Sequence, residues 1–161
     1  GRSIYICDVS FLQGLDSAKR AHPVYIETIQ DSFTKSESWG SRRWDWSTNP
    51  GPVWNANVWM SKADSIEIEL VQGKTSLNTW KTALTKGINQ LEIEVEINPE
   101  SYQGTKKDPL PEPAENGVIY PNPGNYELLL RAKDFEKRLP ISIGDGNSIT
   151  EDELPNPDKK P

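Results

Sequence analysis

Leu91-Glu92-Ile93-Glu94-Val95-Glu96-Ile97 is the stretch of this sequence that decides the fold. Its apolar and charged residues alternate without exception, and a period of two is typical of a β-strand with one face buried and the other in water. The same alternation recurs in Ile66-Glu67-Ile68-Glu69-Leu70 and, less strictly, in Tyr126-Glu127-Leu128-Leu129-Leu130. Three such strands predict antiparallel sheet whose apolar faces form the core.

Other strands are predicted from further apolar runs, at 24–29, 53–60 and 139–143. Pro140 has no N–H to donate to a ladder, so the strand that contains it is expected at a sheet edge. Helix is scarce, and the best candidate is a short segment within 10–20, where Ser10 can cap the first turn. The sequence therefore predicts an all-β fold: an antiparallel, immunoglobulin-like or fibronectin-III-like β-sandwich with a short N-terminal helix.

Two segments do not fit the pattern of strands. The stretch 98–123 contains six prolines, whose nitrogens cannot donate to a sheet, so we predict a long excursion between strands. Loops longer than about 12–15 residues are uncommon and tend to be functional or irregular. Residues 144–161 are acidic and then proline-rich, with almost nothing apolar to bury, and we predict a tail or linker there.

Charge and composition exclude several classes of protein. The net charge of −6 disfavours a nucleic-acid or anionic-membrane partner, because both require clustered Lys and Arg. There is no run of about 20 apolar residues, so no membrane-spanning helix is predicted. The one cysteine, Cys7, cannot form an internal disulfide, and the one histidine, His22, rules out a two-histidine metal site. We therefore assign no catalytic residue, metal ligand or cofactor to the chain.

The glutamates of the alternating strands are the first candidate site. Glu67 and Glu69 share one face of their strand, as Glu92, Glu94 and Glu96 share one face of theirs. Carboxylates about 5–10 Å apart are the catalytic groups of glycosidases. Rows of glutamates on exposed strand faces are also common without any catalytic role, and we interpret these rows as solvated surface. If the two strands are neighbours, like charges face each other and a cation should lie between them. The candidates for that cation are Lys62, Lys86 and Arg131.

The tryptophans are the second candidate site, because five of the six fall within 21 residues: Trp39, Trp44, Trp46, Trp54 and Trp59. The last two lie in a strand-like run and are predicted to pack in the core. The other three lie in a loop with two arginines, and the predicted ligand- or partner-binding residues are Trp39, Arg42, Arg43, Trp44 and Trp46. Indole rings seal domain interfaces and also stack on sugars, so both interpretations stay open.

The order of these pieces resembles one known family. Gly1-Arg2-Ser3-Ile4-Tyr5, followed by Asp8-Val9-Ser10-Phe11-Leu12-Gln13, is similar to the strand that closes the last blade of bacterial sortilin-like β-propellers and to the turn that follows it. Those are Asp-box (BNR) repeat proteins, often labelled sialidase-like glycosyl hydrolases, in which a β-sandwich follows the propeller. Three later stretches resemble that sandwich: 63–70, 86–91 and 122–128. Where relatives show a Trp-Asp pair after an Asn turn, this chain has Leu91-Glu92.

The resemblance implies a division of the chain into four parts. Ile4 and Ile6 would pair the first part with a propeller blade, an added-strand contact. Because the chain opens on Gly1 without a leader, we expect a processed or excised piece of a longer protein. The expected parts are a blade strand, a connecting segment with the helix and the Trp-rich loop, the sandwich core with its proline-rich excursion, and the tail, bounded as 1–9, 10–60, 61–143 and 144–161.

The resemblance also implies a function. We expect a non-catalytic C-terminal module that braces an upstream propeller, in the same precursor or in another chain, and that contacts protein or glycan. Any catalytic site would lie in the propeller, and the setting would be bacterial and extracytoplasmic: secreted, periplasmic or on the cell surface. Two alternatives stay open. One is an independent carbohydrate-binding module that uses Trp39, Trp44 and Trp46, and the other is a glycoside-hydrolase fragment that uses two of the glutamates.

Overall fold

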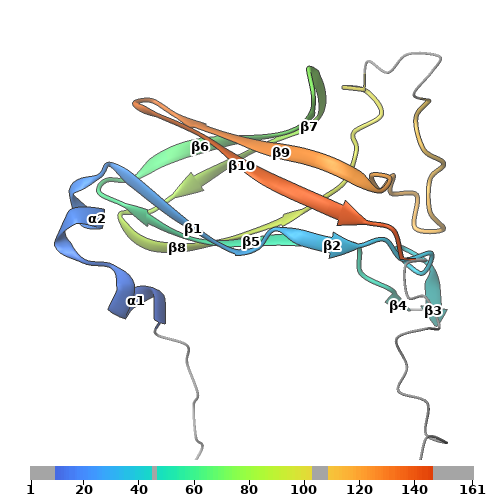
Figure 1. Cartoon of the computed structure of the whole chain (residues 1–161), viewed down its shortest axis with the longest axis horizontal. Coiled ribbons are helices and arrows are strands. Elements are labelled where there is room, and N and C mark those ends of the chain that lie inside the picture. Colours follow the sequence, from blue (N-terminus) through green and yellow to red (C-terminus); the bar gives the residue numbers. More distant parts are fainter. Residues whose placement is uncertain (1–9, 45–46, 103–108, 147–161) are drawn as a thin grey trace, which may run out of the picture.

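Two β-sheets packed face to face form the body of the molecule, and two short helices precede them (Figure 1). The computed structural model describes residues 10–44, 47–102 and 109–146. The helices are α1 (Ser10–Gly14) and α2 (Ser17–Ala21). The strands are β1 (Val24–Gln30), β2 (Ser32–Thr34), β3 (Arg42–Trp44), β4 (Ser47–Thr48), β5 (Val53–Met60), β6 (Asp64–Gln72), β7 (Thr75–Leu84), β8 (Gly87–Glu94), β9 (Gly124–Ala132) and β10 (Phe135–Gly144).

The strand order confirms the predicted all-β sandwich. The smaller sheet has the order β1-β5-β8, the larger has the order β2-β10-β9-β6-β7, and β3 pairs with β4. Paired strands run antiparallel except β2 and β10, which are parallel where β10 ends, from Ser142 to Gly144. The larger sheet is therefore mixed rather than purely antiparallel. The predicted N-terminal helix is present as α1 and α2, two short helices.

The core follows from the period of two. In β6, Ile66, Ile68 and Leu70 are fully buried, while the glutamates between them face outward. β8 and β9 carry the same alternation, so the inward rows of the three strands meet between the sheets. Successive side chains of a strand point to opposite faces, and burial of one face holds the register. Leu129 is buried as well, although it lies on the outward row of β9.

The tryptophans of β5 lie on opposite faces of the smaller sheet. Trp54 is fully buried in the core, as predicted. The prediction of a core position for Trp59 is wrong: it is half-buried on the outer face, in register between Tyr25 of β1 and Ile88 of β8. The two positions are five residues apart, and an odd separation in a strand places two side chains on opposite faces.

The segments between the strands also take part in the fold. Residues 10–60, expected as a connection, contribute β1 and β5 to the smaller sheet. In its described part, the proline-rich excursion is tied to the sandwich by an isolated bridge between Ile97 and Ile119. Pro140 pairs with Glu127 of β9, and β2 pairs with β10 only from Ser142 onward, so this part of β10 is an edge, as Pro140 predicts. The predicted blade strand 1–9, with Ile4 and Ile6, and tail residues 147–161 lie outside the described residues.

Candidate functional site

The Trp-rich loop forms a small hairpin of β3 and β4 at the end of the sandwich opposite α1 and α2 (Figure 1). The Gly40 N–H donates to the Asn49 carbonyl (3.0 Å), and the Asn116 N–H donates to the Gly40 carbonyl (3.1 Å). The Arg42 N–H donates to the Glu115 carboxylate over 2.5 Å. Residues of the proline-rich excursion therefore hold the hairpin, although they lie far later in the chain.

Trp39, at the base of this hairpin, is engaged by the chain itself. Its ring lies 5.8 Å from the Tyr120 ring at 58°, and Lys35 Nζ lies 5.1 Å from the ring centre. Lys35 Nζ also donates to the Pro121 carbonyl over 3.0 Å, and burial lowers the pKa of Lys35 below its ordinary value. Trp39 still borders a cavity of about 460 Å³, together with Phe33. Its partly buried indole is thus held by contacts to Tyr120 and Lys35 within the chain and also borders the cavity.

Of the two described indoles of the predicted site, Trp44 is the one that faces solvent. It is 61% exposed on β3, and Arg42 on the same strand is exposed too. Arg43 lies between them in β3, and Trp46 lies outside the described residues. The structure therefore places Arg42 and Trp44 on one short strand, where both are exposed, whereas Trp39 is partly buried.

A second surface, which the sequence did not point to, lies beside α1. It is a groove of about 390 Å³ on the outer face of the smaller sheet. Three exposed aliphatic side chains line it: Leu12 (51% exposed), Ile29 (56%) and Ile88 (40%). We call it the α1 groove. Exposed aliphatic side chains that gather at one groove are characteristic of contact surfaces, whereas isolated ones are ordinary.

Local contacts of the helices shape the α1 groove. The Phe11 ring of α1 stacks on Tyr25 of β1 at 6.2 Å and 21°, and Lys19 Nζ of α2 lies 5.2 Å from the centre of the Tyr25 ring. The Asp16 side chain caps α2 by accepting the Lys19 N–H over 2.8 Å. These contacts hold α1 next to the sheet face, so that Leu12 stands beside the groove and not over the core.

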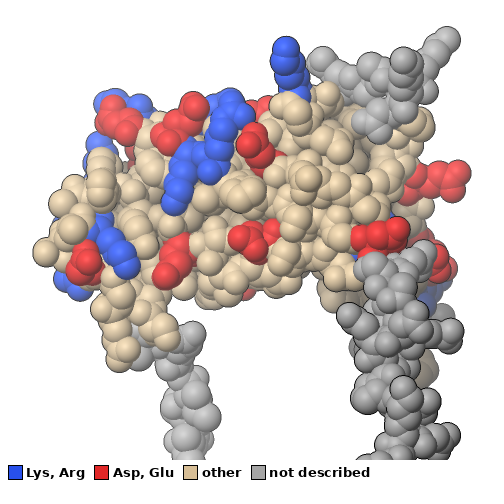
Figure 2. Space-filling view, in the orientation of Figure 1, with Lys and Arg blue, Asp and Glu red and all other residues tan. Residues whose placement is uncertain are grey.

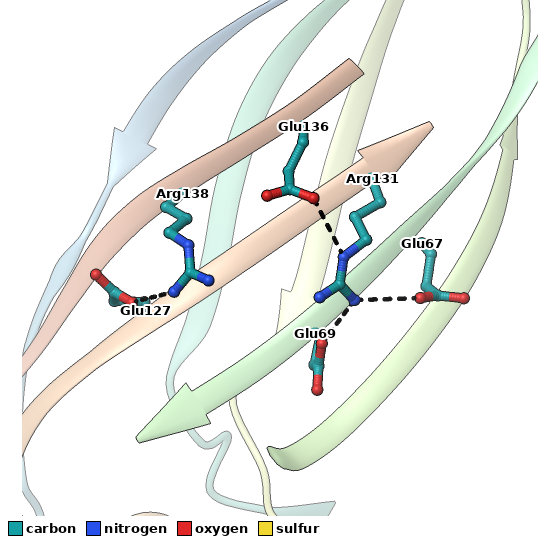
Figure 3. A network of polar contacts seen from close by, with 6 residues as sticks. All are labelled: Glu67, Glu69, Glu127, Arg131, Glu136 and Arg138. Carbon is teal, nitrogen blue, oxygen red and sulfur yellow. Dashed lines mark hydrogen bonds and ion pairs between the residues drawn. The ribbon is translucent and has the colours of Figure 1, made fainter. Parts of the chain in front are cut away.

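The glutamate ladders belong to different sheets. β6, with Glu67 and Glu69, lies in the larger sheet, whereas β8 lies in the smaller one. The two strands are not neighbours, so their glutamates do not face each other as like charges. Arg131, one of the predicted cations, lies between Glu67 and Glu69 from the neighbouring strand β9 (Figure 3). Its Nη1 is 2.7 Å from Glu69 and 3.5 Å from Glu67, and its Nε is 3.6 Å from Glu136. The hydrogen bond to Glu69 is the main cause of a raised Arg131 pKa.

Glu96 differs from the other glutamates of the ladders. Burial raises the pKa of its carboxyl above the ordinary value, the Glu94 charge raises it further, and a hydrogen bond from Asn78 acts in the opposite direction. Sequence reasoning grouped Glu96 with the solvated ladder and did not single out Asn78. The available signal was local: the ladder ends at Asn98-Pro99, and Asn78 stands next to Leu77 in an otherwise inward-facing part of β7.

Charge and metal-binding potential are modest in the described residues. Figure 2 shows positive and negative side chains interspersed on one face, with wide uncharged areas between them. No group of three or more His, Cys, Asp or Glu side chains in the described ranges could hold a metal ion. Within those ranges, no helix has the length and apolar character needed to cross a membrane.

Comparisons with known proteins give no family. No family model and no curated protein matches the chain. Among solved structures, a β-glucosidase from Listeria innocua in complex with gluconolactone is similar with a TM-score of 0.37 and 10% identity, over 75% of this chain and 16% of that one. A β-glucosidase from Erythrobacter marinus gives 0.36 and 10%, over 73% and 14%. The chain thus spans less than a fifth of the length of these enzymes, and the likeness is too slight to carry an argument about function.

Proposed function

We propose that this chain is a non-catalytic β-sandwich module that braces an adjoining domain, and that this domain is a β-propeller of the sortilin-like kind. The observation that carries the proposal is the α1 groove, where Leu12, Ile29 and Ile88 expose aliphatic surface together. The propeller itself is suggested by the sequence resemblance alone. The setting that goes with it is bacterial and extracytoplasmic.

Burial of this groove would supply most of the bracing energy. A fully buried Leu or Ile side chain contributes roughly 1.5–3 kcal/mol relative to an exposed one. The Ile88 and Ile29 side chains project from strands, and Leu12 from a helix held by ring stacking, so a partner would meet a preformed surface. The groove is therefore suited to a lasting contact between domains.

The β3–β4 hairpin offers a second contact. Trp44 and Arg42 are exposed on it, and Trp and Arg are the residue types most enriched among energetically dominant interface positions. The hairpin and α1 lie at opposite ends of the sandwich (Figure 1), so contact at both would restrain rotation of the module against its partner.

The test uses the longer protein that this proposal requires, in which a propeller precedes the chain. Its sequence upstream of Gly1 should contain Asp-box repeats, and Leu12→Ser combined with Ile29→Thr and Ile88→Thr should lower the unfolding temperature of the propeller in calorimetry. The same changes in the 161-residue chain alone should leave its unfolding temperature nearly unchanged, because all three side chains are exposed. Lys81→Thr, exposed on β7 of the other sheet, is the control. An upstream region without a propeller, or a propeller unaffected by the triple variant, contradicts the proposal.

Glycan binding is the second candidate function, and the exposed indole of Trp44 is the observation that favours it. A row of sugar-binding rings would need Trp39 as well, and Trp39 packs against Tyr120. Among the described indoles of the predicted site, the binding would therefore depend on Trp44. Binding to a glycan array that is abolished by Trp44→Ala would support this function. If the chain binds no glycan on the array, this function is contradicted.

A further inference from the structure

The two sheets are joined at one corner of the sandwich, where the chain continues beyond β8 and meets β7. The Asn98 N–H donates to the Leu77 carbonyl over 2.9 Å, and Asn78 Nδ2 donates to the Glu96 carbonyl over 3.3 Å. On its other side, the Ile97 N–H donates to the Ile119 carbonyl over 2.8 Å. Residues 96–98 are therefore held between β7 and the proline-rich excursion.

A pocket of about 360 Å³ opens at this corner. Asn78 and Trp80 enter it from the inward row of β7, where the paired positions on β6 are Leu70 and Ile68. Asn78 is 5% exposed, and its Oδ1 accepts the Thr79 N–H over 2.8 Å. The described residues that line it are Asn78, Trp80, Glu96, Ile97, Asn98, Pro99, Gly117, Val118 and Ile119.

The described residues that line the pocket include one acidic side chain and no basic one. Among the described residues of its lining, Glu96 is the only ionisable one, and Glu94 acts on it as a second negative charge. On the larger sheet, by contrast, arginines accompany glutamates: Arg131 contacts three of them, and Arg138 contacts Glu127 at 3.0 Å. Among the ion pairs of the described residues, none includes Glu94 or Glu96.

We propose that this pocket binds an ammonium or guanidinium group, with Glu96 as its counter-ion and the Trp80 ring as the surface on which its alkyl chain and charge rest. A cation within about 6 Å of an indole face gains roughly 0.5–2 kcal/mol from the ring, the larger value where water is excluded. The Asn78 amide holds the backbone of Glu96 in place and so positions the carboxylate. This inference concerns a different surface from the α1 groove and does not depend on the proposed bracing function.

Electrostatics distinguishes a cation from a neutral hydroxylated ligand. Any ligand that fills the pocket removes water from the Glu96 carboxylate. This desolvation costs free energy unless the ligand compensates the charge. A neutral sugar can donate a hydrogen bond to the carboxylate but leaves the repulsion from Glu94 in place. A cation compensates both effects, since opposite charges close together favour the charged form of each group.

The test is an NMR titration of the 161-residue chain with n-butylamine and agmatine as free cations, and with the amides of Gly-Lys-Gly and Gly-Arg-Gly as presented side chains. The indole N–H of Trp80 and the side-chain amide of Asn78 should shift in a saturable manner, with dissociation constants on the order of 1 mM. Glu96→Gln should weaken binding at least fivefold. Glu92→Gln, which changes an exposed glutamate of β8, the strand that precedes Glu96, is the matched control and should leave binding unchanged. Saturation by the tripeptides alone would assign the pocket to a peptide side chain, and saturation by the amines as well would assign it to the cation itself.

Three results would overturn the proposal. The first is the absence of any saturable shift with all four cations, in a chain whose amide spectrum shows the folded state. The second is equal binding in Glu96→Gln. The third is binding of n-butanol or glucose as tight as that of n-butylamine, which would show that the pocket recognises shape or hydroxyl groups and not charge.

Discussion

Glu67 of β6 lies directly opposite Arg131 of β9, and the guanidinium of Arg131 reaches the next outward residue of β6 as well, Glu69 (Figure 3). One cation therefore neutralises two glutamates of one strand from the neighbouring strand. Glu136, across the other side of β9 on β10, contacts the same guanidinium at 3.6 Å. The outward row of the larger sheet is thus a charge network that spans three strands.

Removal of the central cation should destabilise this network. Arg131→Met leaves Glu67 and Glu69 without their shared partner, and it should lower the free energy of unfolding by up to about 1 kcal/mol, since exposed ion pairs are weak and screened. The loss should be larger at 20 mM than at 500 mM NaCl in urea unfolding. Arg138→Met, which removes one ion pair, is the control and should have a smaller effect. A loss that does not depend on salt would mean that packing, and not charge, is the contribution of Arg131.

Glu96 should make stability depend on pH. Its folded pKa lies above the ordinary value of 4.5, so the charged carboxylate is less stable in the folded than in the unfolded chain. Stability from this group is therefore fully present below the unfolded pKa and is lost as the pH rises through the folded pKa. Glu96→Gln should be more stable than the parent at pH 7, and the difference should disappear near pH 3.5 in urea unfolding. Glu92→Gln should not show this trend, and a Glu96→Gln difference that is constant over this pH range would contradict the assignment.

The opposite faces of β5 predict different costs for its two tryptophans. Trp54→Ala removes a fully buried indole from the core and should lower the free energy of unfolding by about 3–5 kcal/mol. Trp59→Ala, on the outer face, should cost less than half as much. Denaturant unfolding of both variants measures the difference. Equal losses would mean that Trp59 is packed as tightly as a core residue.

The hairpin should depend on Gly40. Its φ of 69° lies in the left-handed region, and an added Cβ would meet the Asn116 and Ala114 side chains closer than any normal contact. Gly73 has a φ of 61° with open space around its added Cβ, so it isolates the backbone contribution, about 1–2 kcal/mol. Gly40→Ala should lose more stability than Gly73→Ala and should shift the amide signals of β3 and β4. Equal losses would show that Asn116 moves aside at no cost.

Much of the fold could be predicted because strand periodicity is local. The alternation in 66–70 and 91–97 predicted which side chains are buried, and Pro140 predicted a local edge. The prediction for Trp59 was wrong because a tryptophan was assigned to the core from its residue type, against the period of its own strand. Of the predicted binding residues, Arg42 and Trp44 lie on one exposed strand. Trp39 packs on Tyr120, which is 81 residues further along the chain, so its partial burial could not be predicted from local sequence.

The sequence by itself determined the strands that correspond to β1, β5, β6, β8, β9 and β10, and it determined the apolar face of those that alternate, because side chains repeat every two residues along a strand. It did not determine β2, β3, β4 or β7. Only the tertiary structure decided which strands are neighbours. It separated the two glutamate ladders into different sheets, placed Arg131 between Glu67 and Glu69, and brought Asn78 and Trp80 of β7 to Glu96. Those contacts join residues distant in sequence, and they are selected by how the whole set of apolar faces packs together, which no local pattern encodes.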